Sequence, residues 1–166
     1  MSNLLDEIKE WNTPIVGAYL LWQFSSGYQK KHVDGEAPVV YLHFIANAIL
    51  TDIELSENIS RRRKNLESYV RSFIDEKRSD LLAELHQRVL SKRNNTLAAI
   101  DIAVANGILA WNCNDATLCP RDLQSPRGAM KLSSTVSKMG DKAFVLGEWF
   151  SKHDLVTITS YLGVLI

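Results

Sequence analysis

Two stretches near the start of the chain are apolar on almost every side. The run TPIVGAYLLWQFSSGYQ opens with a capping threonine and a proline, and it predicts a helix over 14–29. A second run, PVVYLHFIANAIL, predicts a helix over 38–50 in which only His43 and Asn47 are polar. A helix that is apolar all round is surrounded by protein. We therefore expect either a central core hairpin of these two helices or a permanent interface with another protein.

The middle of the chain predicts short helices followed by one pair of strands. An amphipathic helix is expected over 65–76, a second after the capping residue Ser79, and a third over 96–106. From residue 108 the apolar pattern changes from helical to alternating, which predicts a β-hairpin at about 108–120. Three helices and a hairpin is the order of a winged-helix unit, and we expect such a part over 62–120.

Two further helices are predicted near the carboxyl end, after a polar loop over 121–131. Ser133 or Ser134 can cap the first of them, and Asp154 caps the last, which stays apolar to Ile166. The fold class that follows is mainly α, a helical bundle with a winged-helix-like segment carrying one small hairpin. We expect a single domain over 1–166, with N-terminal apolar helices over 13–50 and C-terminal helices over 133–166.

The first C-terminal helix predicts two kinds of contact. Gly140, Ala143 and Gly147 lie close together on it and leave a shallow place where another backbone could approach. Trp149 and Phe150 are neighbours, about 100° apart around a helix, so we expect only one of them in the core. Phe150 continues the apolar stripe and is assigned to the core. The predicted partner-binding residues are Trp149 and, on the last helix, Leu155 and Tyr161.

Composition narrows the class of protein. Of the 166 residues 46% are hydrophobic, and 19 basic side chains balance 19 acidic ones. A chain of this length buries a sufficient core without metal or disulfide, and a net charge of zero argues against coating nucleic acid through bulk charge. The acidic start lacks the features of a secretory signal, and no apolar run is long enough for a membrane span. We expect a cytoplasmic protein without a membrane partner.

Motifs of catalysis are missing from the sequence. Cys113 and Cys119 are too few for a four-ligand zinc site, and Cys113 is expected to pack beside Trp111 in the hairpin. The four histidines have no metal-binding spacing. His43 with Asn47 could hold a ligand, although a polar pair hydrogen-bonded inside a core needs fewer assumptions. We expect no catalytic residue, no cofactor site and no metal site.

The feature best suited to phosphate contact is the basic run Arg61, Arg62, Arg63 and Lys64. The third predicted helix offers no base after Asn95 and carries Asp101, so sequence-specific reading of DNA is a poor fit. Three alternatives remain open for the run: contact with the DNA backbone inside a larger complex, pairing with upstream acidic residues or an acidic partner, and a solvated charged face. The upstream acidic residues are Asp52, Glu54 and Glu57.

Three segments carry a resemblance to a known family. They are TPIVGAYLLWQFSSGYQ, APVVYLHFIANAIL and FVLGEWFSKHDLVTITSYLGV, and their order and spacing over about Trp11 to Val164 resemble the middle component of bacterial ABC-three-component systems. Lamassu-type anti-phage and anti-plasmid operons belong to that group. Many relatives have Leu-Pro-Leu within the second helix, where this chain has Ala46-Asn47-Ala48.

The resemblance implies an adaptor without catalysis of its own. Such a subunit joins an SMC- or Rad50-like ABC ATPase to a separate effector, often a nuclease. Excess apolar helix surface and missing catalytic motifs are what an obligate subunit is expected to show. The alternatives are a winged-helix DNA-binding regulator, which binds duplex DNA alone with a steep salt dependence, and a stand-alone enzyme.

Overall fold

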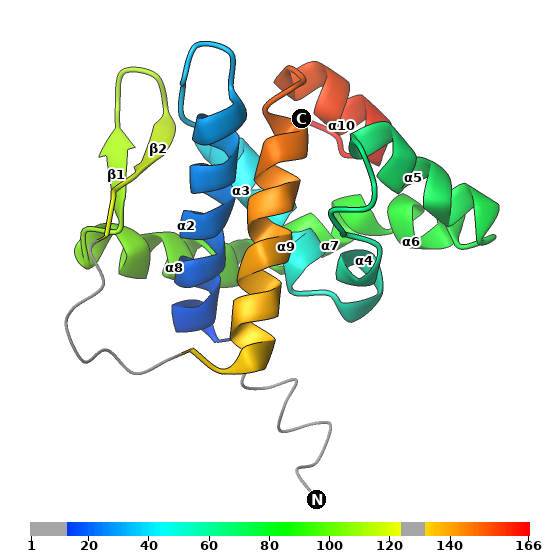
Figure 1. Ribbon diagram of the computed structural model, residues 1–166, viewed down its shortest axis with the longest axis horizontal. Coiled ribbons are helices and arrows are strands. Elements are labelled where there is room, and N and C mark those ends of the chain that lie inside the picture. The colour runs from blue at the N-terminus through cyan, green and yellow to red at the C-terminus, as the bar shows by residue number, and fades with distance from the viewer. Residues whose placement is uncertain (1–12, 124–131) are drawn as a thin grey trace, which may run out of the picture.

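The computed structural model describes residues 13–123 and 132–166 and confirms a mainly helical fold (Figure 1). Its centre consists of two helices, α2 (Pro14–Lys31) and α9 (Ser134–Phe150), which lie side by side and run in the same direction (Figure 1). The predicted caps are present: the Thr13 side chain accepts a hydrogen bond from the Val16 amide at 3.4 Å, and Ser133 accepts one from Val136 at 3.3 Å.

Glycine lets the backbones of α2 and α9 touch. A β-carbon at Gly27 would overlap the carbonyl oxygen of Phe144, and one at Gly147 would overlap that of Phe24. Gly140 faces the Tyr19 ring. The predicted site of close backbone approach on α9 is therefore confirmed, and the approaching backbone is α2 of the same chain.

The larger of two apolar cores lies on one side of this pair. It contains Leu20 and Phe24 of α2, Leu146 and Phe150 of α9, and buried side chains of the helices between and after them. These helices are α3 (Val40–Leu50), α4 (Ile53–Glu57), α5 (Leu66–Asp75), α6 (Ser79–Ala83), α7 (Leu85–Ser91) and α10 (Leu155–Leu162). Asn65 and Ser68 form a capping box at the start of α5.

The second core lies on the other side of α2, where α8 (Arg93–Ala105) and the hairpin pack. The hairpin consists of β1 (Leu109–Asn112) and β2 (Thr117–Pro120), as predicted, and the strands are antiparallel with Trp111 opposite Leu118. Side chains of α2, α8 and both strands meet in this core: Ala18, Leu21, Ala99, Ile100, Ala103, Leu109 and Leu118. Helix α2 is thus shared by both cores, which explains its apolar character on almost every side.

Two predictions about local structure are wrong. Pro38 does not open a helix, because Val39 is extended and its neighbours bond to the hairpin. The Leu118 amide donates to the Pro38 carbonyl at 3.1 Å, and the amide of Val40, where α3 begins, donates to the Ala116 carbonyl at 2.8 Å. Cys113 is exposed beyond the end of β1 and does not pack beside Trp111.

The predicted winged-helix-like part, 62–120, contributes to both cores. The hairpin packs on α2 and α8, whereas α5 belongs to the other core. A bridge between Val39 and Thr117 also joins the segment before α3 to β2. Most of the predicted loop 121–131 lies outside the described residues.

The chain after α10 departs from the helix predicted to continue to residue 166. Asp154 caps α10 as predicted, accepting a hydrogen bond from the Thr157 amide at 2.7 Å. Gly163 then adopts a left-handed conformation at φ 67°, which ends the helix. In the described ranges, every helix is too short or too polar to span a bilayer.

Candidate partner-binding surface

The aromatic pair near the end of α9 lies wholly inside the protein. Phe150 packs edge-on against Phe24 of α2 at 5.5 Å between ring centroids, which confirms its assignment to the core. Trp149 is only 3% exposed and contacts the Tyr69 ring of α5 at 5.7 Å, so its assignment to an exposed partner contact is wrong. Helix α9 is enclosed by α2 on one side and α5 on another, and neighbours 100° apart can therefore both be buried.

The two partner-binding residues predicted on α10 differ in exposure. Leu155 is half-buried and packs against the larger core. Tyr161 is 40% exposed and meets His153 edge-on at 5.6 Å between ring centroids. Of the three predicted contact residues, Tyr161 is therefore exposed, Leu155 half-buried and Trp149 buried.

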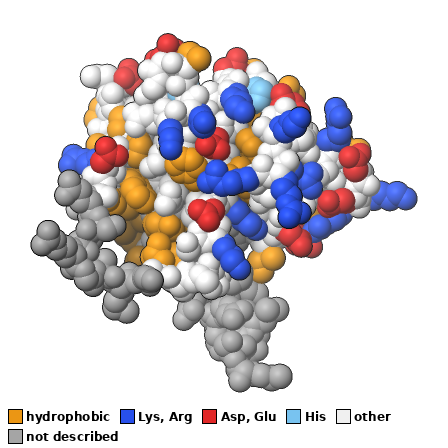
Figure 2. Space-filling model, viewed as in Figure 1, with side chains coloured by type: hydrophobic (Ala, Val, Ile, Leu, Met, Phe, Trp, Pro, Cys, Tyr) orange, Lys and Arg blue, Asp and Glu red, His pale blue; other side chains and the backbone are white. Residues whose placement is uncertain are grey.

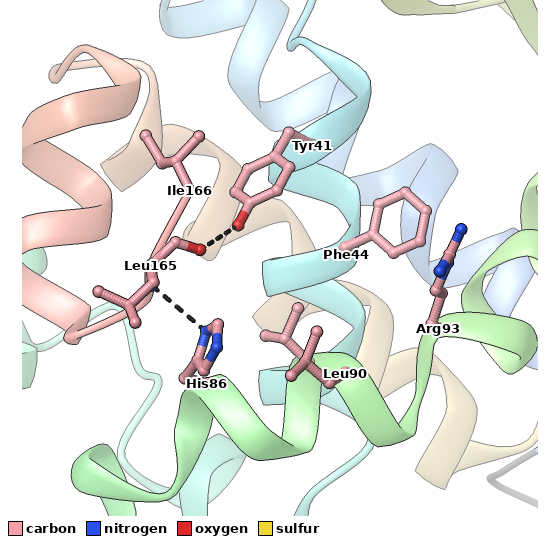
Figure 3. A pocket seen from close by; sticks show the side chains of 8 residues that line it. Tyr41, Phe44, His86, Leu90, Arg93, Leu165 and Ile166 are labelled. Carbon is pink, nitrogen blue, oxygen red and sulfur yellow. Dashed lines mark hydrogen bonds between the residues drawn. The ribbon is translucent and has the colours of Figure 1, made fainter.

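An apolar groove that the sequence did not predict lies nearby, between the chain after α10, α3 and α7 (Figure 3). Its volume is about 540 Å³. Leu90 is 53% exposed, Leu165 71% and Ile166 75%, so three large apolar side chains face solvent at one place. The groove is lined by Tyr41, Phe44, His86, Val89, Leu90, Arg93, Leu165 and Ile166.

Hydrogen bonds fix the carboxyl-terminal wall of this groove. The Tyr41 hydroxyl donates to the Leu165 carbonyl at 2.7 Å, and the Leu165 amide donates to Nδ1 of His86 at 3.3 Å (Figure 3). The exposed position of Leu165 is therefore set by side chains of α3 and α7. The guanidinium of Arg93, at the start of α8, lies near Phe44 at the far end of the groove and adds a positive charge to an otherwise apolar lining (Figure 3).

The surface of α8 does not favour direct reading of DNA. Leu97 and Val104 are exposed on it, with the exposed Asp101 between them at helical spacing. A recognition helix presents donors and acceptors to base edges, and an apolar face with a carboxylate offers few of them.

The basic run lies in the segment before α5, and its members differ. Arg61, Arg62 and Lys64 are exposed. Arg63 is half-buried: its Nε donates to the Asn58 carbonyl at 2.9 Å, and its guanidinium lies 3.9 Å from Glu76.

The acidic residues upstream of the basic run form ion pairs with arginines outside the run. Arg78 pairs with Glu54 at 3.2 Å and with Glu57 at 4.0 Å, and Arg88 pairs with Asp52. The alternative that the basic run pairs with these three carboxylates is therefore wrong.

The polar pair of α3 is buried, and each member is hydrogen-bonded to a different neighbour. His43 lies between the Ser25 hydroxyl at 2.7 Å and the Val39 carbonyl at 3.1 Å, and burial lowers its pKa to about 4. The Asn47 amide donates to Thr96 at 2.9 Å. The prediction that both residues are hydrogen-bonded inside the core is confirmed, and the buried Oδ1 of Asn47 has no hydrogen-bond partner among the described residues. Within the described residues, no group of three or more His, Cys, Asp or Glu could hold a metal ion.

These features describe a class of protein: a helical protein with apolar cores and an exposed apolar groove of the kind that a subunit presents to its partners. The family model of ABC-three component (ABC-3C) system Middle Component 3 matches residues 1–165. The chain belongs to this family and is a middle component of an ABC-three-component system. No curated protein and no solved structure matches it.

Proposed function

We propose that this middle component is a non-catalytic adaptor of a bacterial, Lamassu-type defence complex in the cytoplasm. It joins an SMC/Rad50-like ABC ATPase to an effector, such as a nuclease, in anti-phage or anti-plasmid immunity. Membership of the family implies partners among the other components of the system. The observation that carries the proposal is the exposed apolar groove between α3, α7 and the chain after α10.

The energetics of this groove favour an occupied state. Full burial of one leucine or isoleucine side chain contributes about 1.5–3 kcal/mol. The exposed parts of Leu90, Leu165 and Ile166 amount to about two whole side chains, so covering them gives about 3–6 kcal/mol before the costs of association. Arg93 at the rim suits a carboxylate on the occupant. The groove therefore fits an amphipathic segment of a partner component, with apolar side chains on one face and an acidic residue beside it.

The test is co-purification of the tagged chain with the ATPase and effector encoded beside it, in wild type and in Leu90→Lys. Leu90 is on the surface of α7, so the substitution leaves the core intact. Ile74→Lys is the matched control, because Ile74 is 61% exposed on α5 and lies outside the groove. We expect Leu90→Lys to weaken binding of one partner at least 30-fold, corresponding to about 2 kcal/mol, and Ile74→Lys to leave it unchanged.

Two results would contradict the adaptor function. Equal partner binding by wild type and both variants would show that the groove is not the contact. A wild-type chain that stays monomeric and retains neither the ATPase nor the effector would remove the proposal itself, since we expect the isolated chain to self-associate through its exposed apolar side chains.

A further inference from the structure

A groove with an excess of positive charge follows α9 on the face shown in Figure 2, where Lys and Arg side chains gather over α9 and the segment before α5. It consists of two adjoining hollows of about 290 and 450 Å³. Arg61 and Val145 line both, so the hollows lie next to each other. The first hollow also contains Lys138 and Lys142 of α9.

The second hollow brings together cations that are far apart in the sequence. Lys31 comes from the end of α2, Arg63 and Lys64 from the basic run, and Lys152 follows α9. The two hollows together hold seven cations and two carboxylates, an excess of five positive charges on a chain whose net charge is zero. Charge gathered in a groove with protein walls focuses the field on an anionic ligand.

Most of these cations form no ion pair with the residues that the structure describes. Arg63 forms an ion pair with Glu76, and the other six have no carboxylate within 4.0 Å among the residues that the structure describes. The carboxylates nearest in sequence to the basic run are bound by Arg78 and Arg88, as shown above. The positive charge of the groove is therefore available to a ligand from outside the chain.

The shape of the groove indicates a long polyanion. Lys152 lies fourteen positions after Lys138, along and just beyond α9, which is about 21 Å at 1.5 Å per residue. Over that length of duplex axis, one DNA strand has about six phosphates, at 3.4 Å each. Single strands bind by stacking their bases on exposed aromatic rings, but the aromatic side chain of the groove, Trp149, is buried. A row of cations without a stacking platform suits the backbone of a duplex.

We propose that this groove between α9 and the basic run binds the phosphate backbone of duplex DNA without reading its sequence. Its exposed phosphate contacts are Lys31, Arg61, Lys64, Lys138 and Lys152, and Arg62 lies outside it. The proposal is independent of the adaptor function, because the apolar groove has no lining residue in common with this one.

The test measures the binding of fluorescein-labelled 30-base-pair duplexes of two unrelated sequences, by anisotropy, between 50 and 200 mM salt. The full chain is used with whatever partner components it retains on purification. The groove variant is Arg61→Gln with Lys152→Gln. The matched control, Arg71→Gln with Lys77→Gln, removes the same charge from exposed positions outside the groove. Unchanged midpoints of thermal unfolding show that both variants are folded.

We expect the groove variant to bind both duplexes on the order of tenfold more weakly per lost contact at 0.1 M salt. The slope of log affinity against log salt should become shallower by about 1.8, or 0.9 for each contact. The control should match wild type. The proposal is overturned if the groove variant and the control have the same affinity and slope, or if wild type does not bind duplex DNA at 50 mM salt. Loss of a protein partner with unchanged DNA affinity overturns it too, and assigns the groove to an acidic protein surface.

Discussion

The contact between α2 and α9 gives a sharp test of the fold. In Gly147→Ala, the new β-carbon would overlap the Phe24 carbonyl oxygen and lie 2.7 Å from the Tyr28 amide nitrogen. Both atoms belong to the backbone of α2, which cannot rotate away as a side chain does. Relief therefore requires the two helices to separate.

The cost of separation exceeds the gain in helix propensity. Alanine in place of glycine within a helix contributes up to about 1 kcal/mol. Overpacking costs about 1–3 kcal/mol or more. If the two helices move apart by 0.5–1 Å, each contact between them loses about a quarter to a half of its dispersion energy. The Phe24–Phe150 contact lies at this junction and would be weakened. We expect Gly147→Ala to lower the free energy of unfolding by about 3 kcal/mol.

Thermal unfolding of the chain, in dilute solution below the onset of self-association, measures this loss. At about 2–4 °C per kcal/mol for a chain of this size, the midpoint should fall by about 6–12 °C. Gly140→Ala is the control on the same helix, because the three atoms nearest to its β-carbon all belong to the side chain of the half-buried Tyr19, which can move. We expect a change below about 1 kcal/mol there. A Gly147→Ala variant as stable as wild type, or more stable, would refute the close contact of the two backbones.

Two further predictions concern buried side chains. The pKa of His43 is about 4 in the folded protein and near 6.5 in the unfolded chain, so only the unfolded chain gains a proton as pH falls from 6.5 to 4. The free energy of unfolding should therefore drop by about 2 kcal/mol between pH 6.5 and 5. The variant His43→Gln should lose this pH dependence, which paired denaturant titrations of the two proteins measure. Trp149→Ala and Phe150→Ala should each destabilise the fold by about 3–5 kcal/mol, and a normal unfolding midpoint with weakened partner binding in Trp149→Ala would contradict its burial.

The sequence predicts local structure well where the signal lies in one segment. Thr13 with Pro14, and Asp154, mark helix starts that the structure confirms, because a cap needs only its own backbone neighbours. The prediction that a helix begins at Pro38 is wrong because this segment bonds to a strand about 80 residues later in the chain. Its φ suits an extended segment as well as the first turn of a helix.

The candidate sites were harder to predict because their residues come from separate segments. The apolar groove needs Tyr41, Leu90 and Leu165 to meet, and no periodicity links them. The basic run is evident in the sequence as four consecutive cations. Lys31 and Lys152, which line the groove together with it, are isolated from it in the sequence. Trp149 was misassigned because one helix pattern does not show how many neighbours enclose the helix.

The shared position of α2 ties folding to the timing of protein synthesis. Its principal neighbour, α9, begins roughly 100 residues after α2 ends. A ribosome adding about 5–20 residues per second takes about 5–20 s to make that stretch. For an interval of about this length, α2 lies outside the ribosome before α9 emerges, and its apolar side is open to chaperones and to other nascent chains. A partner translated from the same message could meet α2 before the chain's own α9 does.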